Sequence, residues 1–192
     1  CGFIDRRNIE YFGDYIMAGT LSVQKIQGLA TAADPTTIEI ASGHVLSQTG
    51  SIIQAVQSST TTYFQSTSSS FVNAFTATVT PKRATSKIMI IGSMCGIANN
   101  GGGLTIESRL NRNLSGDTVV GKYNRHCHIA GGTFLGVSHN FTEIDSPNTT
   151  STITYEYQMR NQNGNGSYFR FNDYHTGTAD TRSTFTFLEI AQ

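Results

Sequence analysis

A His-x-His pair, His126 and His128, is the most compact group of metal-ligating residue types in the 192-residue sequence. Residues two apart on a strand point to the same face, so both imidazoles would be presented together. Three copies around a trimer axis would offer six imidazoles, which suits an octahedral transition metal. The alternative is a polar strand end beside Gly131 and Gly132, with surface or interface histidines. We expect no cofactor, and the pair is the single candidate for a metal at a trimer axis.

Eight carboxylates are the candidates for the paired acids of a glycoside hydrolase. They are Glu107, Asp117, Glu143, Asp145, Glu156, Asp173, Asp180 and Glu189. Folding can bring carboxylates to within about 5 to 10 Å of each other, but the sequence selects no pair among them. We expect these side chains on solvated strand faces instead.

No nucleophile motif is present in the chain. The sequence lacks a GxSxG elbow, and Cys127 beside His126 is no protease signature, because the Cys and His of such sites come together through the fold. The glycines at 101–103 lack the Lys-Ser/Thr of a phosphate-binding loop and precede a strand pattern, so we predict a hairpin turn. The sequence therefore predicts a protein that is not an enzyme.

The charge balance argues against two classes of partner. Lys+Arg and Asp+Glu both number 13, so the formal net charge is zero and no basic surface indicates nucleic acid or an anionic membrane. A small basic cluster, Lys82-Arg83 with Lys87, is interpreted as protection of a sheet edge. No stretch approaches the ~18 consecutive apolar residues that span a bilayer. We expect neither nucleic-acid binding nor membrane insertion.

The three cysteines, Cys1, Cys95 and Cys127, are too few and too widely spaced for a disulfide framework or a thiolate zinc site. We expect reduced thiols. The rest of the composition favours strands: Gly numbers 19, Trp is absent and hydrophobic residues make up only 38%. Glycine and asparagine suit tight turns, and β-branched residues suit pleated surfaces.

Alternating patterns recur from Gly50 to the end of the chain. In the segment 153–160, Ile153, Tyr155, Tyr157 and Met159 share one face, which we expect to be buried. The Asn-Gly pairs of 161–166 predict a hairpin to the next strand, SYFRFND. The pattern predicts an all-β fold, an antiparallel β-sandwich or jelly roll.

One strand pattern, KIMIIGSM, is apolar on both faces. A sandwich strand has one core-facing side, so the second apolar side needs another cover, for which a neighbouring subunit is the natural choice. Ile88 and Ile90 alternate with Met89 and Ile91 in this pattern. We therefore expect a homotrimer, with the second set at the contact between copies.

Three regions are expected along the chain. Residues 1–16 are a possible non-native upstream leader, because Gly13-Asp14 can be back-translated to a ribosome-binding sequence just before Met17. Residues 17–49 carry weak extended patterns and form an attachment or stem segment. Residues 50–192 form the β-sandwich head.

Several phrases, in order, are similar to tail-fibre and related appendage proteins of phages, especially marine ones. They are MAGTLSVQKIQGLA, ASGHVL, GSIIQAVQ, TVTPKRATSKIMIIGSM followed by RLNR, and FTFLEIAQ, running from Met17 to Gln192. The resemblance implies a homotrimeric virion protein, with a jelly-roll head like the complement-type and tumour-necrosis-factor-like domains. His-x-His pairs also resemble the axial iron sites of some phage fibre tips.

The resemblance implies a virion tail appendage, assembled in the host cytoplasm, that contacts other virion tail proteins and a host-surface glycan or protein. Exposed tyrosine and polar residues of SYFRFNDYHTGTAD, notably Tyr174 and His175, are candidates for glycan contact, with a plain surface loop as the alternative. Other functions considered are a head decoration, a tail adaptor and a polysaccharide depolymerase. The receptor-binding residues themselves are not determined by the sequence.

Overall fold

The computed structural model describes residues 48–100, 103–129, 135–173 and 181–192. These residues all belong to the unit Val45–Gln192. The expected leader, Met17 and nearly all of the expected stem lie outside the described residues, so these predicted boundaries stay predictions. No helix among the described residues is long and apolar enough to cross a membrane.

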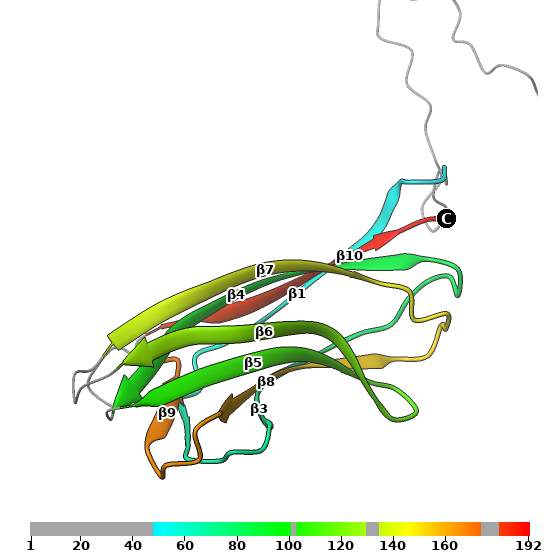
Figure 1. The fold of residues 1–192 in the computed structure, drawn as a ribbon. Helices are drawn as coiled ribbons and strands as arrows, with labels where there is room; N and C mark the ends of the chain where they lie inside the picture. Colours follow the sequence, from blue (N-terminus) through cyan, green and yellow to red (C-terminus); the bar gives the residue numbers. More distant parts are fainter. Residues whose placement is uncertain (1–47, 101–102, 130–134, 174–180) are drawn as a thin grey trace, which may run out of the picture. The chain divides into compact units, whose positions relative to one another are not determined.

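The described residues form ten β-strands, shown in Figure 1. They are β1 (Ile52–Thr60), β2 (Phe64–Ser66), β3 (Val72–Val79), β4 (Lys87–Asn100), β5 (Leu104–Asn113), β6 (Asp117–Ile129), β7 (Leu135–Asp145), β8 (Ile153–Asn161), β9 (Tyr168–Phe171) and β10 (Ser183–Ile190). Pro81 follows the end of β3, as expected for a residue that cannot donate to a ladder.

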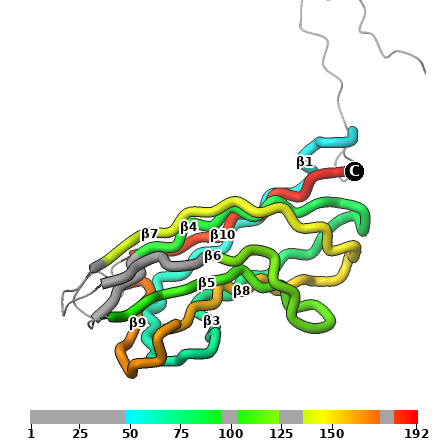
Figure 2. The backbone as a smooth tube through the Cα atoms, viewed as in Figure 1, coloured from blue at the N-terminus to red at the C-terminus, as the bar shows by residue number. Residues whose placement is uncertain are grey.

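The strands lie in two antiparallel sheets. Sheet A has six strands: five follow the order β1-β10-β4-β9-β2, and β7 pairs with β4 beside this path. Sheet B has the order β3-β8-β5-β6. Figure 2 shows β7, β4 and β10 in one layer and β6, β5, β8 and β3 in the other. The chain passes repeatedly between the layers, as in a jelly roll. The predicted all-β antiparallel sandwich is confirmed.

Aromatic side chains from both sheets fill the space between the layers. Phe75 of sheet B stacks on Phe185 of sheet A at a centroid distance of 4.9 Å, and Tyr155 of sheet B stacks on Phe187 of sheet A at 5.3 Å. Tyr157 is also fully buried. The predicted inward face of β8 is therefore confirmed, and its tyrosines are core residues.

The predicted Asn-Gly hairpin is wrong. Residues 161–166 connect β8 of sheet B to β9 of sheet A, so the two strands do not pair. The local conformation suits a turn, since Gly164 and Gly166 have φ of 61° and 79°. Both edges of β8 are occupied by β3 and β5, however, and the chain has to cross to the other layer.

Two other turn and edge predictions are also wrong. The glycine segment 101–103 joins β4 of sheet A to β5 of sheet B and is therefore not a hairpin turn. The basic cluster at Lys82, Arg83 and Lys87 leads into β4, which pairs with β10 on one side and β7 on the other. A strand with two neighbours has no edge to protect.

Candidate functional site

An apolar row crosses the outer face of sheet A. The ladder register aligns Ile144 of β7, Met89 of β4, Leu188 of β10 and Ala55 of β1. Ile144 is 56% exposed, Ala55 is exposed, and Met89 and Leu188 are half-buried. Their strand neighbours point into the core, so this row faces away from it.

More apolar side chains border this row. Ile91 is 38% exposed, and Ile52 is 59% exposed and lies opposite the half-buried Ile190. We call the whole set the outer stripe: Ile52, Ala55, Met89, Ile91, Ile144, Leu188 and Ile190. Contiguous exposed apolar side chains on a soluble domain mark a surface for interaction.

The two faces of β4 divide as the sequence pattern predicts. Ile88 and Ile90 are fully buried between the sheets, whereas Met89 and Ile91 belong to the outer stripe. The apolar character of both faces is therefore confirmed. The cover of the outer face by a neighbouring subunit, and with it the homotrimer, stays a prediction.

The outer face of sheet B is polar. Three cross-strand pairs between β5 and β8 carry it: Glu107–Arg160, Arg109–Gln158 and Asn111–Glu156. Their side-chain hydrogen bonds are 2.8, 2.6 and 3.1 Å long, in that order. The guanidinium carbons of Arg109 and Arg160 both lie within 4.6 Å of the centre of the Phe71 ring. We call these six paired residues, with Phe71, the polar lattice.

The expectation of solvated carboxylates is wrong for four of the eight candidates. Glu107, Glu156, Asp173 and Glu189 are buried. Burial is tolerated because each carboxylate accepts hydrogen bonds from donors within reach. Glu189 accepts the backbone N–H groups of Lys82 and Arg83 at 2.8 and 3.0 Å. Glu107 and Asp173 form ion pairs, Glu156 accepts hydrogen bonds from the side-chain amides of Asn111 and Gln158, and Glu189 anchors a loop.

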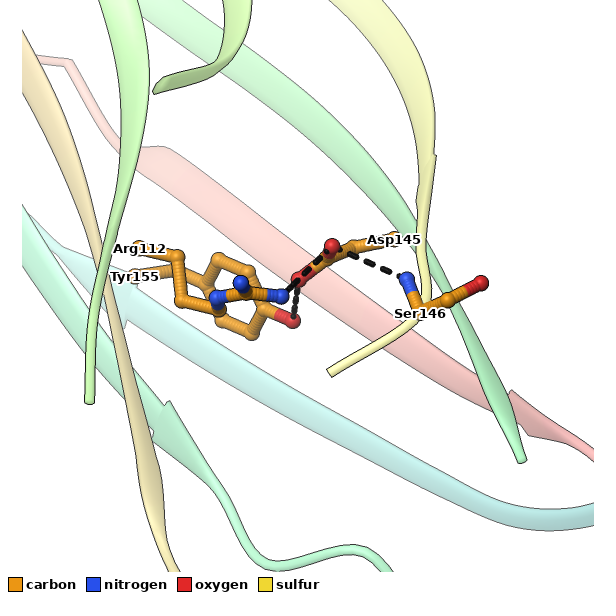
Figure 3. A network of polar contacts seen from close by, with 4 residues as sticks. All are labelled: Arg112, Asp145, Ser146 and Tyr155. Atoms are coloured by element: carbon orange, nitrogen blue, oxygen red, sulfur yellow. Dashed lines mark hydrogen bonds and ion pairs between the residues drawn. The ribbon is translucent and has the colours of Figure 1, made fainter. Parts of the chain in front are cut away.

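Asp145 joins the two sheets (Figure 3). Its carboxylate accepts hydrogen bonds at 2.8 Å from Arg112 of β5 and from the Tyr155 hydroxyl of β8, and at 2.9 Å from the backbone N–H of Ser146. Burial, together with the Asp145 charge, raises the pKa of Tyr155 above its usual value. The tyrosine thus stays a hydrogen-bond donor, and the group clamps β7 to sheet B.

A second polar group lies where β6 approaches β7. The Tyr123 hydroxyl donates to Glu143 at 3.0 Å, and the His139 Nδ1 lies 3.0 Å from the Tyr157 hydroxyl. Burial raises the pKa of both tyrosines above their usual value. The first contact joins β6 to β7 and the second joins β7 to β8. Both therefore link sheet A to sheet B at the side of the sandwich.

The His-x-His pair lies on β6, where His128 pairs in register with Thr105. The side chains of His126 and His128 lie outside the described residues, so the axial metal stays a prediction. Among the residues that are described, no group of three or more His, Cys, Asp or Glu side chains could hold a metal ion. Tyr174, His175 and Asp180 also lie outside the described part of the chain.

A polar and aromatic cluster lies on the short β2–β9 ribbon. The segment SYFRFNDYHTGTAD was predicted to offer exposed residues for glycan contact, but its pairing with Tyr63 and Gln65 was not predicted. The Tyr63 hydroxyl donates to the Gln65 amide oxygen at 2.5 Å, and Arg170 Nε donates to the same oxygen at 3.3 Å. Arg170 also donates to Asp173 at 2.7 Å and to the Tyr168 hydroxyl at 3.1 Å. The sequence signal was an aromatic-x-polar pattern in both TYFQS and SYFRF.

No family model and no curated protein matches the chain. Among solved structures, it is similar to the infectious bursal disease virus VP2 subviral particle, at 13% identity over 74% of this chain and 38% of that chain, with a TM-score of 0.40. It is also similar to the infectious bursal disease virus Gx strain structure, at 14% identity over 82% and 41%, with a TM-score of 0.40. The chain spans about two fifths of the length of these two. At such TM-scores the likeness carries no functional inference.

Proposed function

We propose that the chain is a non-enzymatic structural protein of a virion, which assembles as a homotrimer through the outer stripe. We further propose that it forms the host-facing tip of a tail-fibre-like appendage. The observation that carries the assembly is the exposed apolar stripe on sheet A. The position in the virion is supported by the resemblance of the chain's ordered phrases to phage tail-fibre proteins.

Three isoleucines of the outer stripe keep apolar area in contact with water. Ile144, Ile52 and Ile91 are 56, 59 and 38% exposed in a single chain. Fully burying an exposed side chain of this size contributes roughly 1.5 to 3 kcal/mol, so covering the part still exposed here contributes about half of that, from which the cost of association is subtracted. Several such side chains in one continuous patch are needed to overcome that cost, and the stripe supplies them.

A second copy of the same chain suits this surface electrostatically. The formal net charge of the protein is zero, so copies do not repel one another at long range. The seven residues of the outer stripe are uncharged, and the exposed Lys87 lies beside them, opposite Ile190 in the ladder. A closed cyclic arrangement would cover every stripe, whereas an open one would leave a stripe uncovered at the end.

Light scattering at micromolar concentration tests the assembly. One chain has a mass of 20.8 kDa, and we expect three times that value. A wild-type protein that stays at the mass of one chain would contradict the proposal. Labelling intact particles with an antibody against the chain tests the position, with label expected on the tail, and label on the head would favour a head decoration.

A further inference from the structure

We propose that the outer face of the β2–β9 ribbon is a binding subsite for a neutral saccharide. The inference rests on the proposed host-recognition function and gives that function a location. We call the five residues of the cluster, Tyr63, Gln65, Tyr168, Arg170 and Asp173, the ribbon site.

The pairing of the two strands separates the ribbon site from the core. Gln65 lies opposite Arg170, and Phe64 lies opposite Phe171. Phe169 and Phe171 are fully buried in the core, so the alternating positions face outward. Gln65 is exposed, and Tyr168 and Arg170 are half-buried. The result is a ribbon with an apolar inner side and an amide, a guanidinium and phenol groups on its outer side.

The side chains of this face are held in place before any ligand arrives. Arg170 is fixed on three sides, by Asp173, Gln65 and the Tyr168 hydroxyl, and its guanidinium carbon lies 4.8 Å from the Tyr168 ring centre. The Asp173 side chain is fully buried, which anchors the network to the fold. Groups that are already ordered lose little conformational entropy on binding.

This combination of groups matches the chemistry of a sugar ring. A pyranose presents a face of C–H groups, which packs against an aromatic ring, and hydroxyls that donate to an amide oxygen and accept from amide and guanidinium N–H groups. Tyrosine provides a large contact area with few rotatable bonds and a polar tip. Tyr63, Tyr168 and Gln65 therefore supply the stacking surface and the hydrogen bonds that a saccharide requires.

The charge of the ribbon site selects a neutral ligand. Arg170 is paired with Asp173 at 2.7 Å, so its positive charge is already balanced. An anionic sugar would compete with that carboxylate for the same guanidinium. The described outward side chains of the ribbon also include no aliphatic residue, which makes the site a poor fit for the apolar anchor of a protein partner.

A printed array of neutral and acidic oligosaccharides, probed with the wild-type protein, tests the site. The neutral oligosaccharide with the strongest signal is then titrated by calorimetry. We expect binding to neutral sugars, weakened at least tenfold by Gln65→Ala and by Tyr168→Ala. The matched control is Gln57→Ala, an exposed glutamine of β1 whose replacement should leave the affinity unchanged.

Three outcomes overturn the inference: no neutral sugar bound, binding confined to acidic sugars, or unchanged affinity in both ribbon variants. If circular dichroism shows that Tyr168→Ala unfolds, the exposed Gln65 decides the matter alone. Light scattering on the same samples separates this inference from the proposed assembly. A trimer that binds no neutral sugar refutes the ribbon site only, and a monomer that binds one refutes the trimer only.

Discussion

The two outer faces of the sandwich differ in polarity: that of sheet A is apolar and exposed, whereas that of sheet B is polar and internally hydrogen-bonded. Sheet A carries the outer stripe, where Ile144 is 56% exposed. Sheet B carries the polar lattice, where Glu107 and Glu156 are only 4 and 7% exposed because their neighbours in the ladder cover and bind them. The polar side chains of sheet B pair within a single chain, apart from the buried Asn111 Oδ1, whereas we propose that another copy of the chain covers the outer stripe.

The difference arises from what alternates with the core positions of each strand. In β4 the residues that alternate with Ile88 and Ile90 are the apolar Met89 and Ile91, whereas in β8 the residues that follow Tyr155 and Tyr157 are Glu156 and Gln158. Polar cross-strand pairs satisfy each other inside one sheet. Apolar side chains have no such partner and gain only by leaving water. The comparison therefore predicts assembly through sheet A and not through sheet B.

The largest effects are expected from aspartate substitutions in β4. Ile90→Asp and Ile88→Asp bury a charge between the sheets and should cost about 4 kcal/mol or more, enough to abolish the fold by circular dichroism. Met89→Asp and Ile91→Asp should leave the fold intact and reduce the mass in light scattering to that of one chain. Thr78→Asp, on the exposed outer face of sheet B, is the matched control and should change neither. Outer-stripe variants that remain trimeric would contradict assembly through sheet A.

A smaller loss is expected from Gly92→Ala in the core that separates the two faces. A Cβ at Gly92 would overlap the ring of Phe141, its ladder neighbour on β7. We expect a loss of about 1 to 3 kcal/mol in the free energy of unfolding, measured by urea denaturation. Gly136→Ala on the same β7 strand meets no atom within 4 Å and serves as the control. Equal stability of the two variants would show that the ring moves aside freely.

Arg160→Met tests how much the polar lattice contributes to stability. It leaves the Glu107 carboxylate buried without its cation, but Arg160 is 31% exposed, so solvent moderates the cost. We expect a loss of about 1 to 2 kcal/mol in unfolding free energy, with the trimer mass unchanged. Adding Glu107→Gln should recover part of that loss. An altered mass would mean that sheet B also takes part in assembly.

The smallest effect on stability near neutral pH is expected from the tyrosines between the sheets. The folded pKa values of Tyr123, Tyr155 and Tyr157 lie above the ordinary value of 10.0, so their contribution to stability is complete below that pH and is lost as the pH rises through the folded values. Urea midpoints should therefore fall above pH 10.0 in the wild type. Tyr155→Phe should be less stable at neutral pH but show a shallower alkaline fall. Equal alkaline slopes would contradict this assignment.

Much of the local structure follows from the sequence by itself. Strict alternation identified the buried face of β8, and the unbroken apolar run identified β4 as a strand that needs cover on both sides. These predictions succeed because the two-residue period of a strand is a local steric property, and burial follows it directly. Pro81 marks the end of β3 for an equally local reason.

Only the tertiary structure decided which strands pair and which polar groups meet. The Asn-Gly segment 161–166 is a turn in either case, but it crosses between layers because both edges of β8 are taken by β3 and β5. Likewise, Gln65 and Arg170 are 105 residues apart and meet only because β2 pairs with β9. Strand pairing depends on long-range competition for edges, which no local pattern records. Met89 and Ile91 could therefore be predicted from one strand, whereas the rest of the outer stripe, the polar lattice and the ribbon site required the whole fold.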